Sequence, residues 1–202
     1  MLLLELCSGA SSFAKEAEGW DVVSVDINAS FNPTICGDVC SRSVQSQLLQ
    51  LEPILVVASP PCTMFSRCRT KAKLPLDLEG ALRIVRACLY LCREFAKKGA
   101  HWILESLATG RLKEMPLMEG IPWCGTTYCL WGFRYAKRTK FWHSGFLTLP
   151  PPCRQNCEHV IWNPKSGRWC HPESAQNGPS HIKGGWSDAV ELLRRYSYPP
   201  AL

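Results

Sequence analysis

The sequence lacks the features that mark membrane-spanning, secreted, repetitive and disordered proteins. No run of about 18 apolar residues occurs, so we expect no membrane span and no membrane partner. The first residues, Met-Leu-Leu-Leu-Glu-Leu, have no basic start and include Glu5, which indicates a strand rather than a signal peptide. Internal repeats and low-complexity tracts are also missing. We therefore expect an intracellular chain that forms one domain with a small appendage.

Cysteine, in contrast, is abundant, with 12 among 202 residues. Because no secretion signal is expected, reduced thiols, a metal site or catalysis explain these cysteines better than a disulfide framework. The net charge is +6, from 23 Lys and Arg against 17 Asp and Glu. This mild basic excess favours an anionic partner such as nucleic acid, although many soluble proteins are equally basic without one.

Strand and helix patterns alternate along the first 143 residues. The apolar patterns predict strands over 2–6, 21–26, 34–36, 54–58, 101–104, 123–130 and 140–143, and helices over 13–18, 41–51 and 78–97. This alternation indicates an α/β fold with a Rossmann-like, doubly wound and mostly parallel sheet. Three prolines after Leu149 break the pattern. We therefore divide the chain into residues 1–149 and a small Cys/His-rich segment, 150–202, which ends in a helix predicted over 187–196.

Cys62 follows a buried strand that is stopped by two prolines, in the run Val56-Val57-Ala58-Ser59-Pro60-Pro61-Cys62. Prolines cannot continue a hydrogen-bonded ladder, so the chain must leave the sheet at this point. The cysteine is then carried on a stiff loop at the carboxyl end of a strand, where open α/β sheets bind ligands. Most intracellular cysteines are small core residues, but one held in this way is a candidate nucleophile.

Glu105 lies at the end of the next predicted strand and is expected to face the same crevice as Cys62. A carboxylate does not usually activate a thiol, so its target is more reasonably the substrate. A thiolate attacks carbon 6 of a pyrimidine when the ring nitrogen is protonated or hydrogen-bonded, and a partly buried glutamate supplies that bond. The alternative is that Glu105 caps a following helix.

Two further stretches carry chemistry. The small residues of 5–12 form a tight turn between a strand and a helix, and Asp26, which ends the second strand, can accept hydrogen bonds from ribose hydroxyls. Asp38 is a possible partner for an adenine amino group, or a helix cap. Residues 134–142 interleave cations with aromatics, which suits phosphate and base contacts, or a solvated edge strand protected by lysine.

In this order, these motifs resemble those of the DNA cytosine-5 methyltransferases. Residues 5–12 match the acidic-Leu-Phe-x-Gly-x-Gly turn for S-adenosylmethionine, and 60–62 match the Pro-Pro-Cys loop of the nucleophile. Residues 105–107 match the Glu-Asn-Val signature loosely, and 136–140 match Gln-x-Arg-x-Arg in part. The resemblance covers about residues 1–143 and is strongest to short members of the kind found in phages. It identifies 1–149 as an S-adenosylmethionine-dependent methyltransferase domain.

The resemblance implies methyl transfer from S-adenosylmethionine to carbon 5 of cytosine in double-stranded DNA, in the cytoplasm of a microbe or a phage-infected cell. Cys62 would add to the base, Glu105 would hydrogen-bond it and Arg138 would favour the thiolate. Cofactor contacts are expected at Leu6, Cys7, Ser8, Gly9, Ala10, Ser11, Asp26, Ile27, Asp38, Val39 and Pro60. DNA contacts are expected at Ser66, Arg67, Arg69, Lys137, Arg138 and Lys140.

The chain also departs from the family pattern. Serines replace glycines in the cofactor turn, and Ser106 replaces the asparagine that helps to hold the Pro-Pro-Cys loop. The long target-recognition domain is missing, which predicts a short target context, broad specificity or a protein partner that supplies recognition. In its place, Cys153, Cys157, His159, Cys170 and His171 form a candidate zinc cluster. They could instead be reduced structural residues of a small lobe.

Three other functions remain open at this point. The same chemistry could act on RNA, the fold could be a binding module without catalysis, or the chain could be a structural protein stabilised by metal at its C-terminal cluster.

Overall fold

The computed structural model of the chain describes residues 1–67, 75–174 and 178–179. Its α-helices and strands run in the order β1 Leu2–Leu6, α1 Ser12–Glu16, β2 Asp21–Asp26, β3 Ile35–Cys36, α2 Arg42–Leu48, β4 Leu55–Ala58, α3 Leu78–Lys97, β5 His101–Leu107, β6 Trp123–Thr127, β7 Arg138–His143, β8 Ile161–Asn163, β9 Arg168–Cys170, β10 Glu173–Ser174 and β11 Gly178–Pro179. Short 3-10 helices are η1 Ala29–Phe31, η2 Thr63–Phe65, η3 Leu112–Glu114, η4 Pro116–Met118 and η5 Tyr128–Trp131.

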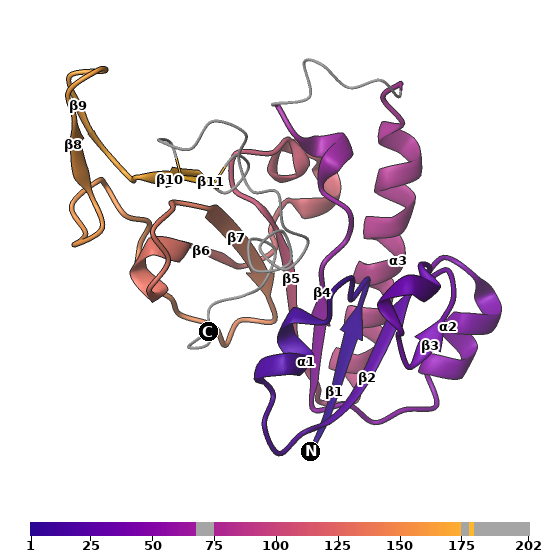
Figure 1. Ribbon diagram of the computed structural model, residues 1–202. Coiled ribbons are helices and arrows are strands. Elements are labelled where there is room, and N and C mark those ends of the chain that lie inside the picture. Colours follow the sequence, from indigo (N-terminus) through magenta and orange to yellow (C-terminus); the bar gives the residue numbers. More distant parts are fainter. Residues whose placement is uncertain (68–74, 175–177, 180–202) are drawn as a thin grey trace.

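A seven-stranded sheet forms the centre of the molecule, in the order β3-β2-β1-β4-β5-β7-β6 (Figure 1). All neighbours from β3 to β5 pair in parallel, whereas β7 runs antiparallel to both β5 and β6. The predicted doubly wound, mostly parallel α/β sheet is therefore confirmed. The strand order reverses between β1 and β4, so the loops after these two strands open a crevice between them, which is where such sheets bind ligands.

The two faces of the sheet bury different sets of side chains, because successive residues of a strand point to opposite faces. Leu4 and Leu6 of β1 belong to the core that α2 and α3 cover, together with Leu104 of β5. On the other face, Ile103 packs with an aromatic cluster of Tyr128, Tyr135 and Phe141, against which Phe13 of α1 packs. Glu5 and Glu105 have the parity of Ile103, so the sheet presents both carboxyl groups on this second face.

Helix α3 forms where the sequence predicts it, at Leu78–Lys97. Its buried residues recur at helical spacing and include Leu82, Val85, Leu89 and Cys92. The Asp77 side chain caps its first turn by accepting a hydrogen bond from Gly80 N at 2.8 Å. This helix fixes β4 and β5, and through them the loops that carry the candidate site.

Several predicted boundaries shift. Helix α2 begins after Ser41, but the Ser41 side chain does not cap it, because its hydroxyl lies 2.8 Å from that of Ser43 instead. The predicted strand over 123–130 ends at Thr127, where the chain enters η5. The helix predicted over 187–196 lies outside the described residues.

After residue 150, the described strands form two separate two-stranded sheets, β8–β9 and β10–β11. The β8–β9 hairpin projects from the body of the molecule (Figure 1). Among the described residues, every helix is too short or too polar to cross a membrane.

Candidate active site

The turn after β1 is held in an unusual backbone conformation. Cys7, Gly9 and Ser11 all have positive φ angles, of 54°, 49° and 54°. The backbone amide of Gly9 donates to Asp26 Oδ2 at 2.8 Å, and that of Asn28 donates to Asp26 Oδ1 at 2.8 Å. Asp26 therefore stabilises the turn itself, in addition to any role in ligand binding. Because a carboxylate accepts about four hydrogen bonds, Asp26 retains capacity for a ligand.

The loop after β4 carries Cys62 and is anchored at both ends. Ser59 N donates to Leu6 O at 3.0 Å, which ties the loop to the end of β1. Phe65 is 1% exposed, and its carbonyl accepts the amide of Arg111 at 2.8 Å. Ser106 stands where the Glu-Asn-Val signature has asparagine, and its buried hydroxyl has no hydrogen-bond partner among the described residues. Phe65, rather than Ser106, thus holds this loop against the sheet.

A cavity of about 210 Å³ joins the two loops. It is lined by Glu5, Cys7, Ser8, Gly9, Ala10, Ser12, Ser59, Pro60, Pro61, Cys62, Glu105, Leu107 and Lys137. The thiol and the glutamate singled out in the sequence therefore face one cavity, at the point where the strand order reverses.

Glu105 and Lys137 form a nearly buried ion pair beside Cys62. Glu105 Oε1 lies 3.8 Å from Lys137 Nζ, with side chains 10% and 12% exposed. Oε1 has no hydrogen-bond partner among the described residues, so it can bond a substrate. Burial alone would lower the pKa of Lys137, but the charge of Glu105, together with smaller contributions from Tyr128 and Cys62, raises it overall. Lys137 therefore remains a cation in the cavity.

Tyr128 holds Lys137 in place. Its hydroxyl is 3.2 Å from Lys137 Nζ, which also lies 4.7 Å from the centre of the Tyr128 ring. Burial raises the pKa of Tyr128 to about 12, so the phenol stays neutral and can accept a hydrogen bond from the ammonium.

The Cys62 thiol is not activated in the free protein. Burial raises its pKa above the ordinary value, the nearby charge of Glu105 raises it further, and Lys137 opposes both. Neutralising the charge of Glu105, or sharing it with a substrate, would remove one of the two effects that oppose the thiolate.

The cation that faces Cys62 is Lys137, whereas the sequence suggested Arg138. Successive residues point to opposite sides, and Arg138, the first residue of β7, is exposed and does not line the cavity. The partial motif match over 136–140 could not decide whether Lys137 or Arg138 faces the cavity.

Glu5 lines the same cavity, although the sequence placed it only at the start of the expected cofactor turn and not among the cofactor contacts. It is 1% exposed, and burial raises its pKa to about 7. Its Oε1 accepts the amide of Phe13 at 3.2 Å, whereas Oε2 is buried without a partner among the described residues. An acidic residue inside an otherwise apolar strand was the available signal.

A second, smaller cavity of about 90 Å³ shares Cys7 and Pro61 with the first. It is lined by Cys7, Val25, Asp26, Ile27, Gly37, Asp38, Val39, Pro61 and Ile84. Asp38 Oδ1 accepts the amide of Cys40 at 2.8 Å, and Oδ2 lies 3.6 Å from Arg83. Of the residues expected to contact a cofactor, only Leu6 and Ser11 line neither cavity.

The residues expected to contact nucleic acid are dispersed. Lys140 Nζ lies 3.5 Å from the centre of the Trp123 ring, in a separate hollow of about 750 Å³ that shares no lining residue with the Cys62 cavity. Arg67 pairs with Glu114, and the adjacent Ser66 directly follows η2. Arg69 lies outside the described residues.

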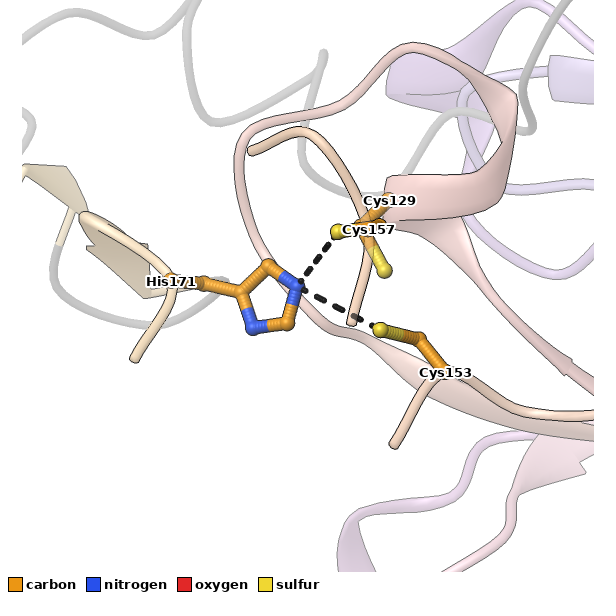
Figure 2. A group of neighbouring side chains, drawn as sticks. All are labelled: Cys129, Cys153, Cys157 and His171. Atoms are coloured by element: carbon orange, nitrogen blue, oxygen red, sulfur yellow. Dashed lines mark hydrogen bonds between the residues drawn. The ribbon is translucent and has the colours of Figure 1, made fainter. Parts of the chain in front are cut away.

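The Cys/His-rich segment contributes a compact cluster (Figure 2). Cys153, Cys157 and His171 lie together as expected, but the fourth member is Cys129 of η5, and neither His159 nor Cys170 belongs to the cluster. Cys170 ends strand β9, and His159 lies 3.8 Å from Glu158. Cys129 was missed because it precedes the cysteine-rich segment by more than twenty residues.

Comparisons with known proteins agree with this geometry. No protein-family model matches the chain. The chain is 32% identical over its full length to the probable DNA (cytosine-5)-methyltransferase of frog virus 3, of which it covers 96%.

Two solved structures share the fold at 14% identity. The methyltransferase EhMeth of Entamoeba histolytica superposes with a TM-score of 0.53 over 74% of the chain, and the S. pombe methyltransferase Dnmt2 with 0.52 over 83%. The chain spans only 56% and 58% of these two proteins. The full-length match to the viral protein shows that the chain belongs to the DNA (cytosine-5)-methyltransferase family.

Proposed function

We propose that the protein transfers a methyl group from S-adenosylmethionine to carbon 5 of cytosine in DNA, through a covalent adduct with Cys62. The observation that carries this proposal is the convergence of Cys62, Glu105 and Lys137 on one cavity at the topological switch point. The family relationship supplies the substrate, since the frog virus 3 relative bears the name of a DNA (cytosine-5)-methyltransferase.

The residues around the two cavities fit the cofactor. Asp26 and Asp38 line the smaller cavity and can accept hydrogen bonds from the ribose and adenine groups. The unpartnered Oε2 of Glu5 lies at the larger cavity and suits the cationic amino group of the methionine part. When bound, S-adenosylmethionine supplies an electrophilic methyl group.

The chain's own residues perform the remaining steps. A cytosine that has left the stack places its ring against Cys62. The proton that Cys62 gives up passes to Glu105 and from there to ring nitrogen 3, while the sulfur bonds to carbon 6 and the ring electrons move to carbon 5. Lys137 stays charged beside this pair and favours the thiolate. Once carbon 5 carries the methyl group, its proton leaves to solvent, the double bond between carbons 5 and 6 is restored, and the Cys62 sulfur departs as a thiolate. Nitrogen 3 then returns its proton through Glu105 to that thiolate.

The direct test is transfer of labelled methyl from S-adenosylmethionine to duplex DNA, with RNA of the same sequence as competitor. We expect incorporation into cytosine-containing DNA, none into DNA in which 5-methylcytosine replaces cytosine, and none by Cys62→Ala. Undiminished transfer by Cys62→Ala would remove the nucleophile from the proposal. Preferential labelling of RNA would move the activity to RNA, and cofactor binding without transfer to either would indicate a binding module.

The small C-terminal segment also bears on specificity. We propose a short target context or broad specificity, unless a protein partner supplies recognition. Methylation sequencing of treated DNA reads the context directly, and a strict long site in the absence of a partner would contradict this.

A further inference from the structure

We propose that Cys129, Cys153, Cys157 and His171 bind a structural Zn²⁺ ion, a site that lies outside the catalytic cavity. The four side chains converge from three segments that are separate in the sequence (Figure 2). Cys129 comes from η5, Cys153 and Cys157 from the loop that follows the prolines, and His171 from the residue after β9. Three thiols and one imidazole are a donor set that zinc prefers.

The distances agree with tetrahedral coordination. All four ligand atoms lie within 4.8 Å of one another. With zinc bonds of about 2.3 Å to sulfur and about 2.0 Å to nitrogen, a tetrahedron separates sulfur from nitrogen by about 3.5 Å. His171 Nε2 lies 3.3 Å from Cys157 Sγ and 3.9 Å from Cys153 Sγ, on either side of this value. All eleven described cysteines carry free thiols, so no disulfide competes for these sulfurs in the structure.

The loop between Cys153 and Cys157 is held in a defined conformation. Gln155 adopts a positive φ of 65°, which turns the chain tightly between Cys153 and Cys157. Cys153 N donates to Thr127 Oγ1 at 2.6 Å, which fixes the loop to the end of β6. The loop thus places both thiols within 3.9 Å of His171 Nε2.

The position of the site explains what the ion does. Cys157 precedes the β8–β9 hairpin and His171 follows it, so the ion closes the base of the hairpin. Ile161, Trp162 and Trp169 of this hairpin are 47%, 51% and 56% exposed, which leaves little apolar burial to hold it. A metal contributes folding free energy where a core cannot form. Cys129 then ties the hairpin base to the catalytic sheet.

The ion also braces the active site, a consequence that rests on the proposed function. Cys129 follows Tyr128, whose hydroxyl and ring hold Lys137 beside Glu105. Near the other end of the cluster, Glu173 lies 3.5 Å from Arg134 in the loop that precedes β7. Loss of the metal should therefore displace Lys137 as well as the hairpin.

Metal analysis of the full chain tests the site directly. We expect one Zn²⁺ per chain after purification without chelators, and its loss in Cys157→Ser and in His171→Ala. Cys170→Ser and His159→Ala are matched controls, because these residues neighbour the cluster but do not join it, and they should keep the metal. Cys157→His retains a ligand atom and should bind zinc, which separates coordination from a general need for the wild-type residue.

A second measurement does not depend on any variant folding. Co²⁺ substituted into the wild-type chain should give the visible absorption of a tetrahedral site and a thiolate charge-transfer band. A folded chain without metal, mass spectra showing these cysteines as disulfides, or metal loss in Cys170→Ser equal to that in Cys157→Ser would each overturn the proposal. Because metal content is measured apart from methyl transfer, failure of the proposed function leaves this result intact.

A different observation carries a second inference: we infer that the β8–β9 hairpin contacts duplex DNA, which again rests on the proposed function. From residue 159 to 172 the chain has no Asp or Glu, whereas it carries Lys165 and Arg168. Trp162 and Trp169 stack edge to face on the hairpin, 5.8 Å between ring centres, and are both about half exposed. Cations beside aromatic rings suit a phosphate backbone and its bases.

Fluorescence anisotropy with a labelled duplex tests this contact. We expect Trp162→Ala and Arg168→Ala to weaken DNA binding at least tenfold and to raise KM for DNA, with cofactor affinity unchanged. Tyr90→Ala, an exposed aromatic on α3, is the control and should bind DNA as the wild type does. Wild-type affinity in both hairpin variants would refute the contact, whereas absence of transfer by the wild type would refute the proposed function instead.

Discussion

Replacing Lys137 by methionine should abolish most methyl transfer, whereas the same change at the neighbouring Arg138 should not. Lys137 Nζ lies 3.8 Å from Glu105 Oε1, and both side chains are nearly buried. At an effective dielectric of about 20, this pair attracts by about 4 kcal/mol, equivalent to about a thousandfold in rate. We take this as the upper limit, and expect kcat to fall between about 10-fold and 1000-fold.

Stability should change in parallel but can be separated from chemistry. Methionine at 137 leaves the Glu105 carboxylate buried without its partner, which costs about 3–5 kcal/mol. Lys137→Met combined with Glu105→Gln removes both charges, so urea unfolding should show most of this loss restored. Methyl transfer by the double variant should stay low, because it lacks both the lysine that favours the Cys62 thiolate and the glutamate that hydrogen-bonds the cytosine.

Single-turnover transfer at saturating DNA is the appropriate assay, because it isolates chemistry from binding and product release. Arg138→Met should keep the wild-type rate at saturation, with a higher KM for DNA if this exposed arginine contacts phosphate. The opposite pattern, with chemistry lost in Arg138→Met and retained in Lys137→Met, would refute the assignment of Lys137.

Three other changes test separate parts of the account. Burial raises the pKa of Glu5 from 4.5 to about 7, so this group favours folding at low pH and loses that contribution as the pH rises through about 7. The free energy of unfolding of the wild type should therefore fall by at most about 3 kcal/mol between pH 5 and pH 8. Urea unfolding should show that Glu5→Gln removes this fall. Gly9→Val should cost about 1–2 kcal/mol of stability, because φ is 49°, and should weaken cofactor binding in calorimetry by filling the cavity. Phe65→Ala should lower the free energy of unfolding by about 3–5 kcal/mol and loosen the Cys62 loop, whereas Ser106→Ala, which removes a buried unpartnered hydroxyl, should change it by less than about 1 kcal/mol. A pH profile unaffected by Glu5→Gln, full cofactor affinity in Gly9→Val, or a larger loss in Ser106→Ala than in Phe65→Ala would contradict the respective argument.

The sheet and the placement of Cys62 were predictable because they depend on local signals. Apolar β-branched runs, their alternation with helices and the two prolines before Cys62 indicate strands and their ends without knowledge of the partners. Glu105 and Cys62 then meet because carboxyl ends of parallel strands share one edge of the sheet.

What the sequence could not supply was information that arises only from pairing. Strand β7 is antiparallel, and its register with β5 decides that Lys137 rather than Arg138 faces the cavity. A shift of one residue would exchange the two. Cys129 joins the cluster of Cys153, Cys157 and His171 only through tertiary contact, so counting within the cysteine-rich segment suggested His159 and Cys170 in its place.

The role of Cys62 is tested most directly with duplex DNA that contains 5-fluorocytosine at a methylated position. Fluorine at carbon 5 blocks the final proton loss, so the bond between Cys62 and carbon 6 persists after methyl transfer. We expect a protein–DNA adduct that survives denaturation, requires S-adenosylmethionine and maps by mass spectrometry to Cys62. Methyl transfer to ordinary cytosine without any such adduct, or an adduct of equal yield in Cys62→Ala, would contradict the covalent mechanism.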